Sequence, residues 1–203
     1  MKAFIIVAIL IAAYIVYNMV TNYEEISYAK SDIDGNVYMI RRGHNKSAKF
    51  LEDSANTLAE INKRVEMLIN YLEANYSNDI TKYYFIKKLR ENYNYSIISE
   101  AAVDPRYTTY TVDKNDMHIC LRTRDSSENI YDINTLMYVI LHEISHMSNY
   151  TPYGEPIEGH GNEFKYIFKF YVEEAIKIGI YNYTNYVQQP IDYCGIKIQS
   201  SII

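Results

Sequence analysis

The spacing of apolar residues predicts a mostly helical domain. In residues 47–74 an apolar residue recurs every seven positions with further apolar residues between, which is typical of an amphipathic helix with one buried face. Residues 164–178 repeat apolar positions at intervals of three and four, and Gly179 follows as a helix end. A shorter helix is predicted over residues 81–93. Such faces need a shared core, so we expect one domain over residues 47–203.

A change of period in the middle of the chain predicts a β-hairpin. Residues 107–112 and 117–122 alternate in polarity and are rich in Thr, Tyr, Val and Ile, and the polar residues between them supply a turn. His118 falls in the second strand and is interpreted as an ordinary strand residue. A helix follows, with Asp132 or Asn134 as its cap. The fold class predicted for this domain is therefore α+β, mainly helical with a small sheet.

The first twenty residues are almost entirely apolar. Residues 3–20 would span about 27 Å as a helix, close to the hydrocarbon core of a bilayer at about 30 Å. We therefore expect a transmembrane anchor over residues 1–20, with a cleaved signal peptide or a buried helix as the alternatives. Lys2 before the segment and Glu24 and Glu25 after it favour a single-pass protein whose domain lies on the non-cytosolic side. Residues 21–46 are mostly polar and are interpreted as a linker.

Composition narrows the range of partners. The chain has 203 residues and a formal net charge of −5, so it lacks the basic excess of a nucleic-acid-binding protein. The heptad spacing of residues 47–74 favours a helix packed on its own domain, with a homodimer through this helix as the second interpretation. Cys120 and Cys194 lie far apart and form no CxxC motif. We interpret them as two small buried side chains, or as a disulfide if the domain lies in an oxidising compartment.

The most informative stretch is LHEISHMSNYTPYGEPIEGHGNEF, residues 141–164. His142 and His146 are four residues apart on a predicted helix, which brings both imidazoles to one face within reach of a single ion. Glu143 lies one step round the helix, where it can accept a proton from a water molecule activated by that ion. The apolar residues 136–141 would bury this helix, and an unpartnered cluster of polar groups there would be costly. The pattern predicts a zinc site.

A catalytic zinc site needs a third protein ligand. His160 follows at the start of the next predicted helix, and Gly159 and Gly161 on either side of it would let the backbone approach the site closely. We expect His160 to be this ligand. The alternative ligands are the nearby carboxylates Glu158, Glu163 and Glu174, in which case His160 would cap its helix or face water.

The motif HEISH followed by HGNEF resembles the zinc peptidases of the WLM and SprT type. In these families the third histidine begins a helix and an aromatic residue follows four positions later, as His160 and Phe164 do here. The hairpin TYTVDKNDMHICLRTRD and the tail IDYCGI also resemble uncharacterised WLM-like peptidases encoded by large DNA viruses. The resemblance covers about residues 80–198. It implies a zincin-like domain with zinc on His142, His146 and His160 and with Glu143 as the general base. The loop from Met147 to Gly159 is longer than in a compact motif of this type.

The function expected from the sequence is hydrolysis of peptide bonds by a membrane-anchored zinc metallopeptidase. A strand of the hairpin, residues 117–122, is the predicted surface for an extended protein or peptide substrate. Tyr153 and Tyr193 are candidates for the donor that stabilises the developing oxyanion. The alternative is an inactive membrane or virion protein whose zinc site is structural or lost.

Overall fold

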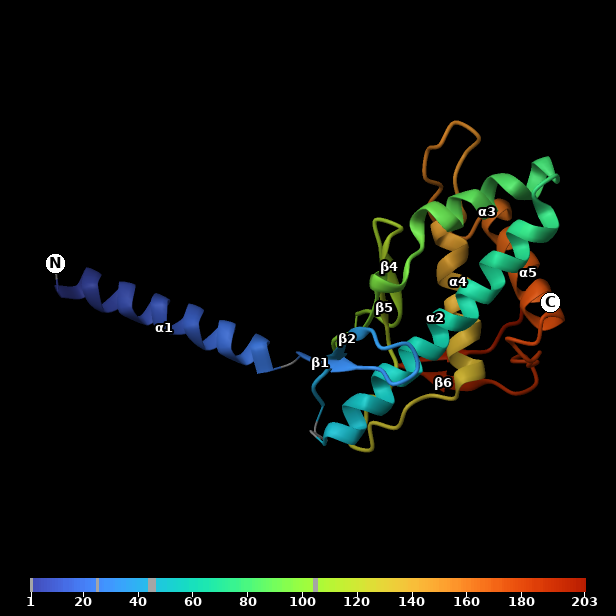
Figure 1. Ribbon diagram of the computed structural model, residues 1–203. Helices are drawn as coiled ribbons and strands as arrows, with labels where there is room; N and C mark the ends of the chain where they lie inside the picture. The colour runs from blue at the N-terminus through green and yellow to red at the C-terminus, as the bar shows by residue number, and fades with distance from the viewer. Residues whose placement is uncertain (1, 25, 44–46, 104–105) are drawn as a thin grey trace.

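A computed structural model describes residues 2–24, 26–43, 47–103 and 106–203. These residues form an α+β fold in which the helices dominate (Figure 1). The helices are α1 (Lys2–Glu24), α2 (Ala48–Tyr76), α3 (Ile80–Asn92), the short 3-10 helix η1 (Tyr95–Ile97), α4 (Ile133–Ser148) and α5 (Asn162–Lys177). The strands are β1 (Ile26–Lys30), β2 (Val37–Arg41), β3 (Ile98–Glu100), β4 (Tyr110–Val112), β5 (Asp116–Ile119), β6 (Ile191–Tyr193) and β7 (Ile196–Ile198).

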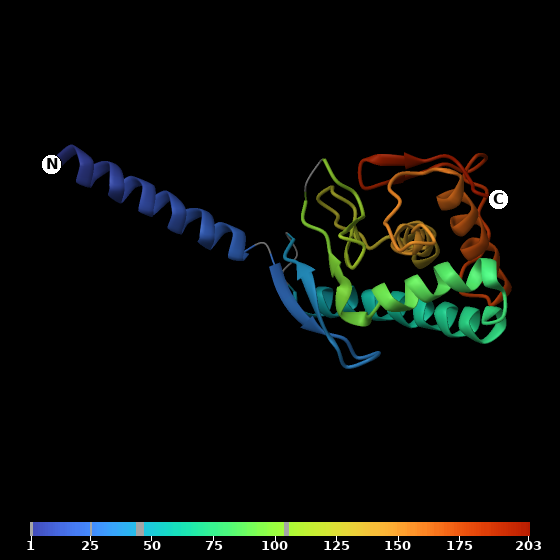
Figure 2. The ribbon, with the colours of Figure 1, turned by 90° about the horizontal axis from the view of Figure 1, so that it is seen from above.

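Helix α4 runs through the middle of the domain. Figure 2 looks nearly along its axis, with α2 and α3 on one side, α5 on another and the C-terminal strands opposite α2 and α3. Asp132 begins the helix as its cap, because its carboxylate accepts hydrogen bonds from the backbone N–H groups of Asn134 and Thr135. Six apolar side chains of α4 are fully buried; they are Leu136, Met137, Ile140, Leu141, Ile144 and Met147. Burial on several sides fixes the direction of this helix, which carries the HEISH motif.

The apolar side chains that recur every seven residues in helix α2 pack inside the same domain. Leu58, Val65 and Leu72 are fully buried in the common core with residues of α3, α4 and α5. Packing within the chain therefore occupies the face that a homodimer through residues 47–74 would need.

The central sheet has the strand order β3–β5–β4. β3 pairs with β5 in parallel, and β4 pairs with β5 antiparallel, with Thr111 opposite Met117. β5 therefore has a partner on both sides, and the expectation that residues 117–122 bind a substrate strand is wrong. β3 and β4 are the two edge strands of this sheet. All three residues of β3 are buried, whereas those of β4 are half-buried or exposed, so β4 is the open edge.

Residues 21–46 do not form the linker expected from their polarity. β1 and β2 pair as an antiparallel hairpin, and Tyr38 and Ile40 of β2 are buried in the core against α2. The Tyr38 hydroxyl accepts a hydrogen bond from Asn62 Nδ2 at 2.8 Å and donates to Asp34 Oδ2 at 2.6 Å. The packed domain therefore begins at β1. Residue 25 and residues 44–46 of the expected linker lie outside the described residues.

The expected transmembrane anchor over residues 1–20 is also wrong. Residues 2–24 form α1, but within the described part of the chain no helix combines the length and the apolar character needed to cross a membrane. The unbroken apolar run covers residues 3–17 and ends before Asn18. At about 1.5 Å per residue it spans about 22 Å, well short of a hydrocarbon core of about 30 Å. The expected single-pass localisation is therefore wrong as well.

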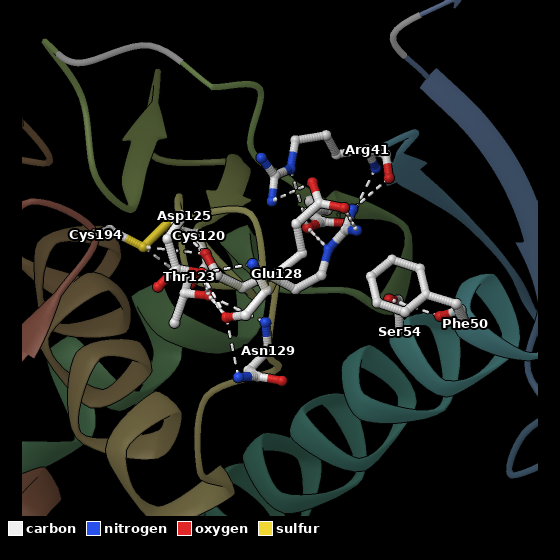
Figure 3. A network of polar contacts seen from close by, with 12 residues as sticks. Arg41, Phe50, Ser54, Cys120, Thr123, Asp125, Glu128, Asn129 and Cys194 are labelled. Carbon is white, nitrogen blue, oxygen red and sulfur yellow. Dashed lines mark hydrogen bonds and ion pairs between the residues drawn. A yellow bond between two sulfur atoms is a disulfide. The ribbon is translucent and has the colours of Figure 1, made fainter. Parts of the chain in front are cut away.

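A buried network of charges joins β2, β3 and the loop after β5 (Figure 3). The Arg122 side chain is fully buried, and its guanidinium donates to both carboxylate oxygens of Glu100, at 2.5 and 2.8 Å. Arg41 pairs with Glu100 at 3.6 Å and with Glu128 at 3.8 Å. Attraction between the two cations and the two anions thus offsets part of the free-energy cost of burying these charges.

Beside this network a disulfide joins Cys120, just after β5, to Cys194 in the turn between β6 and β7 (Figure 3). This differs from the favoured sequence interpretation of two separate buried cysteines. The antiparallel pairing of β6 with β7 turns the chain back at Cys194, which brings it to β5. The two cysteines are 74 residues apart, so the local sequence pattern could not predict that they lie close together.

Candidate metal centre

Helix α4 presents His142 and His146 on one face, one turn apart. Their Nε2 atoms lie 3.2 Å from each other. His142 also packs edge-on against Phe164 and Phe168 of α5, with ring centroids 4.8 and 5.3 Å apart. The aromatic side chains thus hold the ring in place and leave Nε2 pointing toward the other histidines.

The loop between α4 and α5 brings His160 to the same point. Its two ends pair, because Ile157 N donates to Asn149 O at 2.9 Å and Thr151 N donates to Glu155 O at 2.8 Å. Gly159 then adopts a φ of 78°, a conformation that glycine reaches without strain, and Gly161 begins α5 as its N-cap. His160 Nε2 lies 3.1 Å from His146 Nε2 and 3.0 Å from His142 Nε2.

The three Nε2 atoms form a nearly equilateral triangle that fits one metal ion. Zinc binds imidazole nitrogen at about 2.0–2.1 Å with tetrahedral angles, which places two such nitrogens about 3.3 Å apart. Among the described residues, the side chains that could share an ion are the three histidines. The alternative ligands Glu158, Glu163 and Glu174 stand outside this group. His118, whose Nδ1 lies 2.9 Å from Ser99 Oγ in the sheet, also stands outside it.

Burial keeps two of these histidines in the form that binds metals. Burial, together with the neighbouring His146 and His160, lowers the pKa of His142 to about 3. Burial likewise lowers the pKa of His146 to about 4, helped by His160 and Lys114. Both rings are therefore neutral at pH 7, with a lone pair free for a cation.

Glu143 lies beside the triangle in a water-poor setting. Its side chain is buried, and burial raises the pKa of the carboxyl group to about 7, against a hydrogen bond from Thr111 that lowers it. Thr111 Oγ1 donates to Glu143 Oε2 at 2.8 Å. A carboxyl group with this pKa can both take up and release a proton near neutral pH, as a general base requires.

Lys114 joins the parts of the centre. Its side chain is 8% exposed, and Nζ donates to His146 O at 2.8 Å, Ile157 O at 3.1 Å and Asn149 O at 3.3 Å. The first carbonyl belongs to a candidate ligand on α4, and the other two belong to the loop that leads to His160. The turn between β4 and β5 therefore clamps that loop to the end of α4. Glu158 pairs with the same ammonium at 3.7 Å.

Two cavities flank the histidines. One, of about 390 Å³, is lined by side chains of α4 and α5 and by residues 196–202. The other, of about 530 Å³, lies along β4 and the turn with Lys114. His142, Glu143 and His160 line both, so the triangle stands in a cleft that is open on two sides.

The two candidate tyrosines lie in very different places. The Tyr153 side chain is 94% exposed on the loop between α4 and α5 and lines neither of these two cavities. Tyr193 is buried, and its hydroxyl donates to Cys120 O at 2.9 Å and lies 2.5 Å from Thr109 Oγ1. These contacts fix β6 to the start of β4, and Tyr193 also lines the cavity on the α5 side of the histidines, so it stays a candidate donor.

Sequence reasoning missed Thr111 and Lys114. Thr109 and Thr111 are two residues apart on an extended segment, so both side chains point to the same side, one toward Tyr193 and the other toward Glu143. The alternation of polarity in residues 107–112 indicates that Thr109 and Thr111 share one side of a strand. It does not indicate that α4 packs against that side. Lys114 resembled an ordinary turn residue.

The comparisons with known proteins give viral relatives. No family model matches the chain, and no solved structure matches it. Uncharacterized protein R325 of Acanthamoeba polyphaga mimivirus is 35% identical over 209 residues, covering all of both chains. Uncharacterized protein 136R of Invertebrate iridescent virus 6 is 25% identical over 156 residues, which cover 76% of this chain and 81% of the relative. By its likeness over the whole length, this chain belongs to the same family as the mimivirus protein R325.

Proposed function

We propose that this protein is a zinc-dependent peptidase. The observation that carries the proposal is the convergence of the three Nε2 atoms of His142, His146 and His160, at 3.0 to 3.2 Å from one another, with the Glu143 carboxyl group beside them. A structural zinc site is usually closed by four protein ligands, whereas a catalytic site keeps one position open. Three histidines in a cleft that is open on two sides match the second kind.

The residues divide the chemistry between them. His142, His146 and His160 would hold the ion, which when bound would lower the pKa of a water molecule to about 7 and polarise a carbonyl group. Glu143 would accept a proton from the attacking water and later return it to the amine that leaves. Thr111 keeps the carboxylate turned toward the cleft while it does so. The pKa of about 7 suits Glu143 to both steps.

Strand β4 is the surface we propose for an extended peptide. It forms the open edge of the sheet, and Thr111 on it contacts Glu143. Thr109, Tyr110 and Thr111 line the cavity beside the histidines. A peptide that adds to this edge as a further strand would pass the candidate metal ligands.

The test combines metal analysis with peptide cleavage on the full chain. We expect one zinc per chain, cleavage of a mixed peptide library, and a loss of about 10²–10⁴-fold in kcat for Glu143→Gln at unchanged zinc content. His160→Ala should lose zinc and activity together. If Glu143→Gln cleaves as well as the wild type, or if the protein holds stoichiometric zinc without cleaving any library peptide, the peptidase proposal fails and a structural zinc site takes its place.

A further inference from the structure

The cavity on the α5 side of the histidines has a wall made by the C-terminal segment, which we define as residues 196–202. The opposite walls come from Tyr138 and Val139 of α4 and from Phe164 and Phe168 of α5. His142, Glu143 and His160 line the same cavity, so a group bound there lies beside the reacting atoms. Its volume of about 390 Å³ lies within the range of small-molecule binding sites.

The C-terminal segment is held against the domain at several points. Tyr138 OH donates to Ser200 O at 3.2 Å. Ile198 and Ile202 are half-buried and pack against the core. The Cys120–Cys194 disulfide fixes the turn from which β7 begins. The wall is therefore part of the folded domain.

The lining of this cavity selects an apolar group. Aromatic and aliphatic side chains from all three walls face it, and Glu143 is the acidic residue among them. The uncharged polar residues of the lining are Thr108, Thr109, Gln199, Ser200 and Ser201. Lys165 and Lys197, both exposed, add two positive charges at its edge. A cationic side chain would meet these charges and lose its hydration on entry, whereas an aliphatic or aromatic side chain gains by leaving water.

We propose that this cavity binds a large apolar side chain of the substrate at a residue next to the cut bond, and that the C-terminal segment sets the size of the side chain accepted. The inference rests on the proposed peptidase function and deepens it by naming the substrate class. The specificity-determining residue we assign is Ile198, which reaches the cavity from β7 and is not among the candidate metal ligands.

The first measurement is a cleavage profile of the zinc-loaded full chain on a peptide library, read by mass spectrometry. At one of the two residues that flank the cut bond, we expect Leu, Met or Phe to be preferred over Ala by about tenfold or more in kcat/KM. Lys and Arg should be disfavoured at that residue. A matched binding series uses dipeptide hydroxamates that differ only in one side chain, Leu, Ala or Lys, so that recognition is measured without turnover.

The second measurement changes the wall. Ile198→Ala should widen the cavity and move the preference from Leu toward Phe by several-fold, with zinc content unchanged. Ile202→Ala tests the same wall at a second position. The matched control is Ile80→Ala, because Ile80 is 89% exposed at the start of α3 and lines neither cavity beside the histidines. Circular dichroism of each variant verifies that it is folded.

The outcomes separate this inference from the proposed function. Cleavage that depends on Glu143, without an apolar preference or with the same profile in both wall variants, overturns the inference and leaves the peptidase standing. Hydroxamates that bind with a Leu over Ala preference, and lose it in Ile198→Ala, support the inference even if turnover is slow. If neither zinc nor hydroxamate binds, the proposed function and the inference fall together.

Discussion

Thr111 Oγ1 donates a hydrogen bond to Glu143 Oε2 across 2.8 Å, and this bond joins the edge strand β4 to the central helix α4. Burial raises the pKa of Glu143, and the bond from Thr111 acts in the opposite direction because it stabilises the charged form. The pKa of about 7 thus results from burial and the Thr111 hydrogen bond acting in opposite directions, and a single substitution removes the hydrogen bond.

Thr111→Val should make Glu143 harder to ionise. Without the hydroxyl donor the pKa of Glu143 rises above about 7, so activity at pH 7 falls and is recovered as the pH is raised. We expect the acid limb of the kcat/KM profile to move upward by about one pH unit. Thr111→Ser, which keeps the donor, should leave the limb in place. An unmoved limb in Thr111→Val would contradict a role for this bond.

Lys114→Met should weaken zinc binding. Met is similar in size to the aliphatic part of Lys but lacks the ammonium group that donates to His146 O, Asn149 O and Ile157 O. The loop that carries His160 is then less well fixed. We expect about a tenfold to hundredfold loss of zinc affinity, the range found for groups that orient metal ligands. Competition with a chromogenic chelator measures it. Lys87→Met, at an exposed lysine of α3, is the control and should bind zinc like the wild type.

The metal-free protein should lose stability in acid. The folded-state pKa values of His142 and His146, about 3 and about 4, lie below the ordinary 6.5, so the unfolded chain binds more protons as the pH falls below 6.5. Glu143 acts in the opposite direction, because its folded-state pKa of about 7 exceeds the ordinary 4.5 and its contribution falls as the pH rises from 4.5 to 7. The two histidines together change the free energy of unfolding with pH more than the one glutamate does.

The urea midpoint in excess chelator should therefore be lower at pH 4.5 than at pH 6.5. The double variant His142→Gln/His146→Gln removes the two larger contributions and leaves that of Glu143, so its midpoint should change less over the same interval or change in the opposite sense. Equal pH dependence in both proteins would show that these histidines are not buried in their neutral form.

Reduction of the disulfide should destabilise the fold and spare the zinc ligands. The bond closes a loop across 74 residues, which in the chain-entropy account is worth about 4 kcal/mol. Neither cysteine is among the groups that could hold the metal. We expect Cys120→Ser/Cys194→Ser to lower the melting temperature, to retain zinc, and to show a weaker side-chain preference because the turn before the C-terminal segment is released. Loss of zinc in this variant would link the disulfide to the metal centre itself.

The parts of the site that lie on one helix could be read from the sequence. The spacing of His142 and His146 follows from helix geometry alone, and the apolar residues before them predicted the burial of that helix. His160 required a further step, since the shape of a long loop decides whether it returns. The pairing of Asn149 with Ile157 supplies that shape.

Tertiary contacts explain what the sequence did not predict. The segment before α2 is polar on average, but alternate residues of β2, Tyr38 and Ile40, are buried, and two such positions were too few to outweigh a linker interpretation. The apolar amino-terminal run was judged by its total length, although Asn18 shortens its continuous part. The order β3–β5–β4 reversed which strand lies at the edge, because a parallel partner contributed from residues 98–100 cannot be recognised from hairpin spacing.

The open edge of the central sheet is only three residues long, Tyr110–Val112. In the proposed peptidase, a peptide lying along this edge would gain few main-chain hydrogen bonds, so its affinity would come mostly from the side chain that it places in the cavity. The same brevity limits how firmly a strand from a second molecule could attach, since long exposed edges are the ones that template aggregation. An edge of this length could bind a peptide briefly, as the proposed function requires, without becoming a site of self-assembly in concentrated solution.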